Sequence, residues 1–316
     1  MHLALASTSV LLLTPTVYPH DISPLISLQN WKATVNFIEK KYDIKYHPMP
    51  IKAVTGLLSI VNDLLTEKIS RNEAYNKMTS MSSGTHMARF ATALGQLVRR
   101  LPSQPIREDF GEAELCSRFV DPFLFELFDN PDNDTYFRWT NESTDAKHME
   151  ESKERPDFCI TKTCSFEWQM NLGFGEAKSA AQDHDNRVIC WDLIKVAVFC
   201  KQTLDIQVME GTLGVQVIGR TVKFYILVLP AKGLYAFLEL AVIQLPDSLN
   251  SLPGFVTKAG DIIKVLDIFE RICVPASDAA GTMSRRTPTL SLTQVGQIFS
   301  PSKNRKRPCP LKLRTN

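Results

Sequence analysis

A long apolar helix set between strand-like segments constrains this 316-residue chain more than any other feature. Residues 187–204 are apolar most of the way round, which is typical of a helix buried by its neighbours. Strand-like runs over 157–162 and 171–179 precede this helix, and further apolar runs follow it. A strand–helix–strand passage places a crossover helix on a mixed sheet, so the sequence predicts an α/β core.

The apolar runs after that helix are joined by short turns. They cover 213–218, 221–230 and 234–246, and the turns contain Gly219 and Gly233. Short Gly-containing connections between such runs favour antiparallel pairing, so we predict a meander of three strands. A last amphipathic helix over 261–273 closes this core.

Four regions follow from these patterns. Residues 1–28 contain three prolines and are expected to be irregular, and 29–105 carry helical periodicity and form a predicted N-terminal helical extension. The α/β core covers 106–274 and begins with a helix over 111–128, followed by a polar loop over 129–154. The basic stretch 275–316 is expected to be disordered.

Charge is distributed unevenly although the whole chain carries only +2. From Pro275 to the end there are eight Lys or Arg and one acid, Asp278, so this tail carries +7 and the rest of the chain carries −5. The tail includes a basic patch that is typical of nuclear-localisation or nucleic-acid-binding segments. That patch consists of Lys303, Arg305, Lys306 and Arg307. A tail that merely aids solubility is the alternative.

Cysteine usage and hydropathy bear on the cellular environment. The seven cysteines form no CxxC pair, which argues against a zinc site or a disulfide framework and favours an intracellular location. The basic patch of the tail makes a nuclear location the more specific expectation. No apolar segment reaches about 18 residues, so no membrane association is expected. The apolar stretch Val10–Leu13 is a weak feature of a signal peptide, so secretion stays as a further alternative.

Charged residues at the end of the second strand raise the question of function. Glu176 and Lys178 are two residues apart and project to the same face of a strand, and Asp157 begins the strand before it. If the strands pair, the carboxylates of Asp157 and Glu176 converge at a sheet edge and can bind Mg²⁺. Lys178 can then orient a water molecule or stabilise charge in a transition state. Gly173 and Gly175 indicate a bulge or a close approach of backbone.

The string Pro156-Asp157 followed by Glu176-Ala177-Lys178 resembles the PD-(D/E)XK nuclease superfamily, which includes restriction endonucleases and junction resolvases. The resemblance covers about 111–245 and implies a restriction-endonuclease-like core, a mixed β-sheet flanked by helices. It implies that Asp157 and Glu176 bind Mg²⁺ or Mn²⁺ and that Lys178 assists hydrolysis of a phosphodiester bond. The chain also resembles fungal proteins that carry a domain of this kind.

The resemblance also implies supporting residues on the neighbouring helices. Many members of the superfamily complete the metal site with an acid on the preceding helix, and Glu112 faces the right way, with Glu114 as the second candidate. Some members use a polar residue on the following helix, where Asp192 and Lys195 are candidates for substrate contact or support.

Each residue also has a purely structural explanation. Glu176 and Lys178 can form a surface ion pair, Asp157 can be a turn residue, and Glu112 can interact with a helix dipole. Asp192 and Lys195 can be an i,i+3 pair on one helix. The sequence therefore supports two functions: a metal-dependent endonuclease acting on nucleic acid, expected to be DNA, or a catalytically inactive module that binds nucleic acid or protein.

Overall fold

The computed structural model describes residues 1–45, 50–81, 85–107, 110–140, 155–164, 167–182 and 185–299. In this part of the chain, seven strands form one mixed sheet in the order β1-β7-β6-β5-β4-β3-β2. The strands are β1 (Val10–Leu13), β2 (Thr135–Trp139), β3 (Phe158–Cys164), β4 (Glu167–Lys178), β5 (Gly211–Ile218), β6 (Thr221–Ala231) and β7 (Leu234–Gln244). The predicted α/β class is confirmed.

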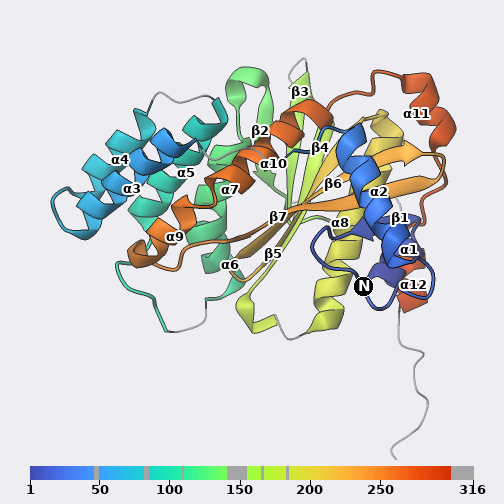
Figure 1. The fold of residues 1–316 in the computed structure, drawn as a ribbon, viewed down its shortest axis with the longest axis horizontal. Helices are drawn as coiled ribbons and strands as arrows, with labels where there is room; N and C mark the ends of the chain where they lie inside the picture. Colours follow the sequence, from blue (N-terminus) through green and yellow to red (C-terminus); the bar gives the residue numbers. More distant parts are fainter. Residues whose placement is uncertain are drawn as a thin grey trace, which may run out of the picture.

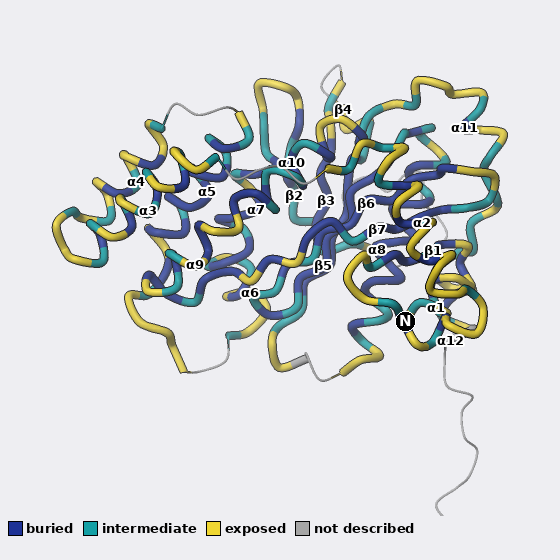
Figure 2. Tube along the Cα trace, viewed as in Figure 1, coloured by how far each residue is buried: buried dark blue, intermediate teal, exposed yellow. Residues whose placement is uncertain are grey.

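Helices cover both faces of this sheet (Figure 1). The α-helices of the described residues are α1 (His2–Ala6), α2 (Leu28–Lys41), α3 (Ile51–Leu65), α4 (Arg71–Thr79), α5 (Thr85–Arg100), α6 (Glu112–Leu115), α7 (Asp121–Phe128), α8 (Asn186–Gln207), α9 (Leu252–Val256), α10 (Ala259–Ile272), α11 (Ala279–Arg285) and α12 (Leu292–Phe299). Helix α8 packs on β4 and β5, and α10 packs on β5, β6 and β7 from the other side. The central strands are therefore buried on both faces (Figure 2).

The connections within the sheet agree with the sequence. Strands β4 and β5 are parallel and are joined through α8, which is the predicted crossover helix. Strands β5, β6 and β7 form the predicted antiparallel meander. Its turns contain Gly219 and Gly233, both at positive φ, where a side chain would introduce strain.

The N-terminal helices lie at two places rather than one. Helices α3, α4 and α5 form a group at one end of the molecule, where α3 contacts α9 and α5 contacts α7 (Figure 1). Helix α2 lies apart from them, and Lys41 at its end donates a hydrogen bond to the carbonyl oxygen of Pro230 in β6 (2.6 Å). A single buried apolar cluster includes side chains from both places. Within the described residues, no helix has the length and apolar character required to cross a bilayer.

The expectation of an irregular N-terminus over 1–28 is wrong for α1 and β1. Strand β1 pairs in parallel with β7, from Val10 opposite Tyr235 to Leu13 opposite Leu238. The apolar stretch that resembled part of a signal peptide is thus an edge strand of the sheet. Its partner lies more than 200 residues away in the sequence, so no local pattern reveals the pairing.

The expectation of a loop over 129–154 is wrong for β2, which pairs antiparallel with β3. Polar residues on both sides of this short strand conceal its alternation of buried Thr135 and Phe137 with partly exposed neighbours. Residues 141–154 lie outside the described part of the chain.

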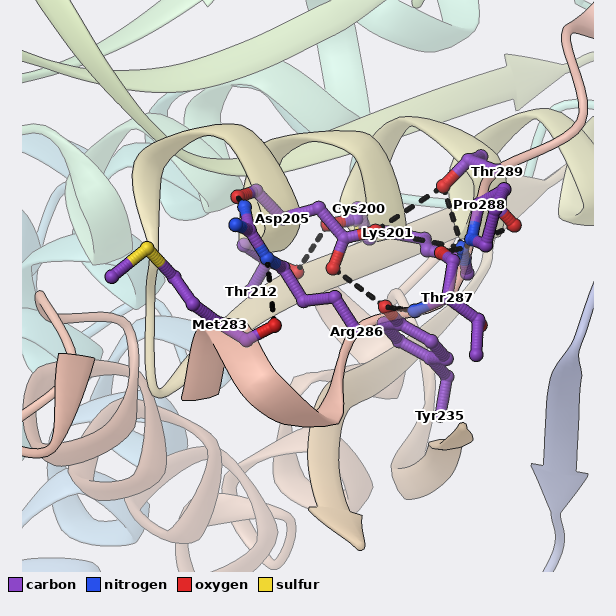
Figure 3. A network of polar contacts seen from close by, with 10 residues as sticks. All are labelled: Cys200, Lys201, Asp205, Thr212, Tyr235, Met283, Arg286, Thr287, Pro288 and Thr289. Atoms are coloured by element: carbon purple, nitrogen blue, oxygen red, sulfur yellow. Dashed lines mark hydrogen bonds and ion pairs between the residues drawn. The ribbon is translucent and has the colours of Figure 1, made fainter. Parts of the chain in front are cut away.

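The expectation of disorder over 275–316 is wrong for the segment up to Phe299. Helices α11 and α12 form there, and Leu292 and Val295 of α12 are buried. Between these helices the chain runs against α8 (Figure 3). The side chain of Lys201, on α8, has no exposed surface there. Residues 300–316, including the basic patch Lys303, Arg305, Lys306 and Arg307, lie outside the described part of the chain.

Lys201 explains why the C-terminal segment is ordered. Its ammonium donates hydrogen bonds to the carbonyl oxygens of Thr287 (2.9 Å) and Pro288 (3.2 Å) and to the hydroxyl of Thr289 (2.5 Å) (Figure 3). The Asp205 carboxylate lies 3.5 Å from the same ammonium and accepts a hydrogen bond from the Tyr235 hydroxyl (2.6 Å). A buried charge requires such partners, so the segment and α8 stabilise each other.

We predict that Lys201→Met lowers the free energy of unfolding by about 3 kcal/mol, because Asp205 is left without its buried cation. Urea denaturation followed by circular dichroism measures this value. The exposed Lys32 on α2 provides the control, since Lys32→Met should change stability by less than about 0.5 kcal/mol. Equal stability of the two variants would contradict the anchoring role of Lys201.

Candidate functional site

Two carboxylates meet where β3 begins and β4 ends. Phe158, the first residue of β3, pairs with Gly175, so Asp157 lies across from Glu176. The Asp157 amide donates to the carbonyl oxygen of Gly175 (3.0 Å), and its Oδ2 accepts from the amide of Ala177 (2.8 Å). The two strands therefore pair as expected and bring the two acids together.

The Lys178 ammonium lies among three carboxylates. Its Nζ is 3.5 Å from Asp157 Oδ2, 3.7 Å from Glu112 Oε2 and 4.0 Å from Glu176 Oε2. These separations are ionic contacts longer than ordinary hydrogen bonds, whereas Nζ donates to the carbonyl oxygen of Ala177 at 3.0 Å. The four charged groups named in the sequence for this site thus lie around one point, with Glu112 the most exposed of them.

The two acids of the preceding helix have different partners. Glu114 binds Arg118 one turn later, with Oε1 2.9 Å from Nη2, so it is paired away from the site. Glu112, in the first turn of α6, contacts Lys178 instead. The choice of Glu112 over Glu114 as the residue nearer the site agrees with this arrangement.

Helix α8 supports Glu176 from behind. The Glu176 side chain is 1% exposed, and its Oε2 accepts a hydrogen bond from Lys195 Nζ at 2.7 Å. Asp192, one helical turn earlier, lies with Oδ1 3.4 Å from the same ammonium. Asp192 and Lys195 are therefore an i,i+3 pair as well as neighbours of Glu176, so both explanations offered by the sequence apply.

Gln216 is a member of this cluster that sequence reasoning missed. It lies beside Glu176 on the adjacent parallel strand β5, and its Nε2 donates to the carbonyl oxygen of Ile189 at 2.8 Å. Within the described residues, Gln216 Oε1, Glu176 Oε1 and Asp192 Oδ2 are buried acceptors without a hydrogen-bond partner. The signal for Gln216 was present, because it is the single strongly polar residue in the apolar run 213–218.

Burial and mutual repulsion change the acidities of this cluster. Burial, together with the charge of Asp157 and against the opposing effect of Lys195, raises the pKa of Glu176 to about 8. Burial also raises the pKa of Asp192 above its ordinary value, although Lys195 and Lys178 oppose this. For Lys178, burial alone lowers the pKa, but the surrounding carboxylates, Asp157 foremost, raise it overall. Lys178 is therefore charged at neutral pH.

Gly173 and Gly175 allow the close approach that brings these groups together. A Cβ at Gly175 would lie 2.0 Å from the Phe158 ring, and one at Gly173 would lie 2.8 Å from the carbonyl oxygen of Leu213. Neither position accepts a side chain without displacement of β3 or β5. The expected close approach of backbone is confirmed at Gly173, whereas the close neighbour of Gly175 is the Phe158 side chain. The β3–β4 pairing also shifts register after Ile160 and after Lys162, in keeping with the expected bulge.

A π-helical turn, Cys116–Val120, links α6 to α7 on the other side of the sheet. Pro122 has no amide hydrogen, so the carbonyl oxygen of Arg118 cannot receive the bond that continues an α-helix. The turn widens, and the Asp121 amide donates to the carbonyl oxygen of Cys116. Asp121 then accepts a hydrogen bond from Trp139 Nε1 at 2.8 Å, which ties this turn to β2.

A pocket of about 460 Å³ opens between this π-helical turn and the strand ends. Its lining residues are Glu112, Ala113, Cys116, Ser117, Asp121, Trp139, Asp157 and Ala177. Burial, with smaller contributions from Glu112 and Asp157, raises the pKa of Cys116 to about 12, so its thiol is neutral at physiological pH and is not an activated nucleophile. The pocket gives a ligand access to Asp157 from the side opposite to α8.

The charges of the cluster do not cancel. It contains four carboxylates and two ammonium groups, namely Glu112, Asp157, Glu176 and Asp192 with Lys178 and Lys195. When all are ionised, the formal charge is −2, which one divalent cation balances. Such an excess is unfavourable where Glu176 is buried.

The donor set fits a hard cation such as Mg²⁺. Mg²⁺ is commonly held by one or two carboxylates, with water and phosphate oxygens completing its shell, and Glu176 has a buried carboxylate oxygen without a partner. Within the described residues, no group of three His, Cys, Asp or Glu side chains is arranged to hold a metal ion. Asp157 and Glu176 therefore fit a cation shared with water or substrate, and not a cage of protein ligands alone.

Comparison of the chain with protein-family models, with curated proteins and with solved structures finds no match. The functional argument therefore rests on the geometry and chemistry of the residues themselves.

We predict that Gly175→Ala lowers the free energy of unfolding by about 1–3 kcal/mol, because the added methyl group overlaps the Phe158 ring. Chemical denaturation measures the change. Gly254→Ala in α9 is the matched control, since a Cβ there meets nothing within 4 Å and the helix should be unchanged or slightly stabilised. Equal effects at both glycines would show that the β3–β4 contact is loose.

Proposed function

We propose that this chain is a Mg²⁺- or Mn²⁺-dependent nuclease that hydrolyses phosphodiester bonds of nucleic acid, with DNA as the expected substrate. The observation that carries this proposal is the convergence of Asp157, Glu176 and Lys178 at a sheet edge beside a pocket. A helix ahead of β3, a mixed sheet and the crossover helix α8 support the finer assignment to a restriction-endonuclease-like core.

Each residue has a separate role in this proposal. Asp157 and Glu176 would hold the cation, and Glu112 would complete the site. When bound, such a cation polarises a phosphoryl oxygen and lowers the pKa of a coordinated water. Lys195 holds Glu176 Oε2 and leaves Oε1 for the cation. Lys178 is charged and only loosely held by its carboxylates, so its ammonium can orient the attacking water or stabilise negative charge on the phosphate.

The alternative is a catalytically inactive module that binds nucleic acid or protein. The contacts of Lys178 with Glu112, Asp157 and Glu176 favour this alternative, because the ammonium already pairs with the carboxylates in the place of a metal ion. A nuclear location would suit either function and rests on the basic patch of the tail.

We predict that Asp157→Asn and Glu176→Gln each reduce both Mn²⁺ affinity and cleavage, the latter by at least about 100-fold, because each replaces a ligand charge by a neutral amide of similar shape. Titration calorimetry measures metal binding, and gel assays with plasmid DNA, single-stranded DNA and RNA measure cleavage. Glu114→Gln is the matched control, since Glu114 is paired with Arg118 and should affect neither. An Asp157→Ala, Glu176→Ala double variant that cleaves at the wild-type rate would refute the proposal.

We predict that Lys178→Met separates binding from chemistry. Removing the ammonium makes the cluster more negative, so Mn²⁺ should bind at least as tightly as in the wild type, whereas cleavage should fall by about 100-fold or more. The same calorimetric and gel assays test both outcomes. Weaker metal binding together with normal cleavage would assign Lys178 a structural role only.

A further inference from the structure

The pocket beside Asp157 is lined by acids that already have partners and by neutral groups. Its acidic groups already have partners, because Asp121 accepts from Trp139 while Glu112 and Asp157 face Lys178. The remaining lining is neutral: Ala113, the Cys116 thiol, the Ser117 hydroxyl, the Trp139 indole and Ala177. The described residues that line this pocket include no Lys or Arg to pair with a phosphate. A neutral, planar ligand with hydrogen-bonding edges fits this lining better.

Trp139 is the main aromatic wall of this pocket. Its ring meets Phe137 at 86° and Phe158 at 65°, with centroids 5.7 and 5.2 Å apart, so neither phenyl ring is stacked on the indole. The side chain is partly exposed, and the hydrogen bond from Nε1 to Asp121 fixes its orientation. An oriented, partly exposed indole provides a surface for stacking of another flat ring.

Size and position agree with one nucleobase. About 460 Å³ falls within the range of roughly 300–1,000 Å³ typical of small-ligand pockets. Asp157 lines this pocket and also belongs to the charge cluster with Glu176 and Lys178, so the pocket and the proposed site of hydrolysis adjoin.

We propose that this pocket binds one unstacked base of the nucleic-acid substrate, stacked on Trp139, with the adjacent phosphodiester at Asp157 and Glu176. This inference rests on the proposed nuclease function and names the substrate class more closely. A base inside a duplex is not available for such stacking, so the substrate is a single strand or a duplex from which a base has been extruded. In this arrangement the π-helical turn contributes Cys116 and Ser117 to the edge of the base, and Asp121, the first residue of α7, holds the indole.

The test uses the full-length protein, a short single-stranded oligodeoxynucleotide containing one 2-aminopurine, and Ca²⁺ in place of Mg²⁺ to limit cleavage. Stacking on an indole quenches 2-aminopurine fluorescence, so the wild type should bind and quench. Trp139→Leu should bind about ten-fold more weakly and lose the quenching, whereas Trp139→Phe should retain most of both. Trp168→Leu is the matched control, because Trp168 is 42% exposed at the opposite end of β4 and should affect neither.

A second measurement does not depend on a folded variant. Photo-cross-linking of the wild type to an oligonucleotide containing 5-iodouracil, mapped by mass spectrometry, should place an adduct on Trp139. Adducts on Trp168 or another tryptophan without one on Trp139, or equal affinity and quenching in Trp139→Leu and the wild type, would overturn the base pocket.

The outcomes separate this inference from the proposed activity. A wild type that binds and quenches but shows no cleavage with Mg²⁺ or Mn²⁺ refutes hydrolysis and supports the base pocket. A wild type that cleaves, with a Trp139→Leu variant of unchanged affinity and kcat/KM, supports hydrolysis and refutes the base pocket.

Discussion

The packing of the Phe158 ring over Gly175 fixes the register on which the candidate site depends. Because no side chain fits at Gly175, the ring can lie directly on β4, and this contact sets Asp157 opposite Glu176. A slip of one residue would turn Glu176 away from α8, since successive side chains of a strand point to opposite faces. The hydrogen bond from the Ala177 backbone amide to Asp157 Oδ2 then holds this carboxylate at the strand end.

This register buries the Glu176 carboxylate, and α8 compensates its charge only in part. Glu176 is drawn into the protein, where a lone carboxylate is unfavourable, and Lys195 supplies one compensating charge. Asp192 adds a further negative charge beside the same ammonium. Burial first and repulsion from Asp157 second raise the pKa of Glu176 to about 8, and Lys195 offsets these effects only in part. Stability alone would not select such a cluster, and buried groups with strongly shifted acidity are typical of functional sites.

The sequence predicted the parts of this structure that are encoded locally. Alternation along 157–162 and 171–179, and the apolar helix between sheet strands, gave the core and the spatial pairing of Asp157 with Glu176. The sequence did not predict β1, because its partner β7 is remote, nor β2, whose polar neighbours hide a short strand. It also missed the ordered C-terminal segment, since a basic, Ser- and Thr-rich composition gives no sign that Lys201 will coordinate its carbonyl oxygens. Contacts between segments that are distant in the sequence leave no periodic pattern in either segment, so sequence analysis does not detect them.

The two sides of the sheet contribute different chemistry to the same edge. From the α8 side come charges, with Lys195 and Asp192 behind Glu176. From the α6–α7 side come Glu112, which faces Lys178, and the neutral groups of the π-helical turn next to Pro122, while Asp121 accepts a hydrogen bond from Trp139. A nucleotide has the same division, with a charged phosphodiester on one part and a neutral flat base on the other. In the proposed nuclease, the phosphodiester would lie at the charged groups and the base at the neutral ones. The ends of β3 and β4 suit such a substrate, because groups from both faces of the sheet meet there.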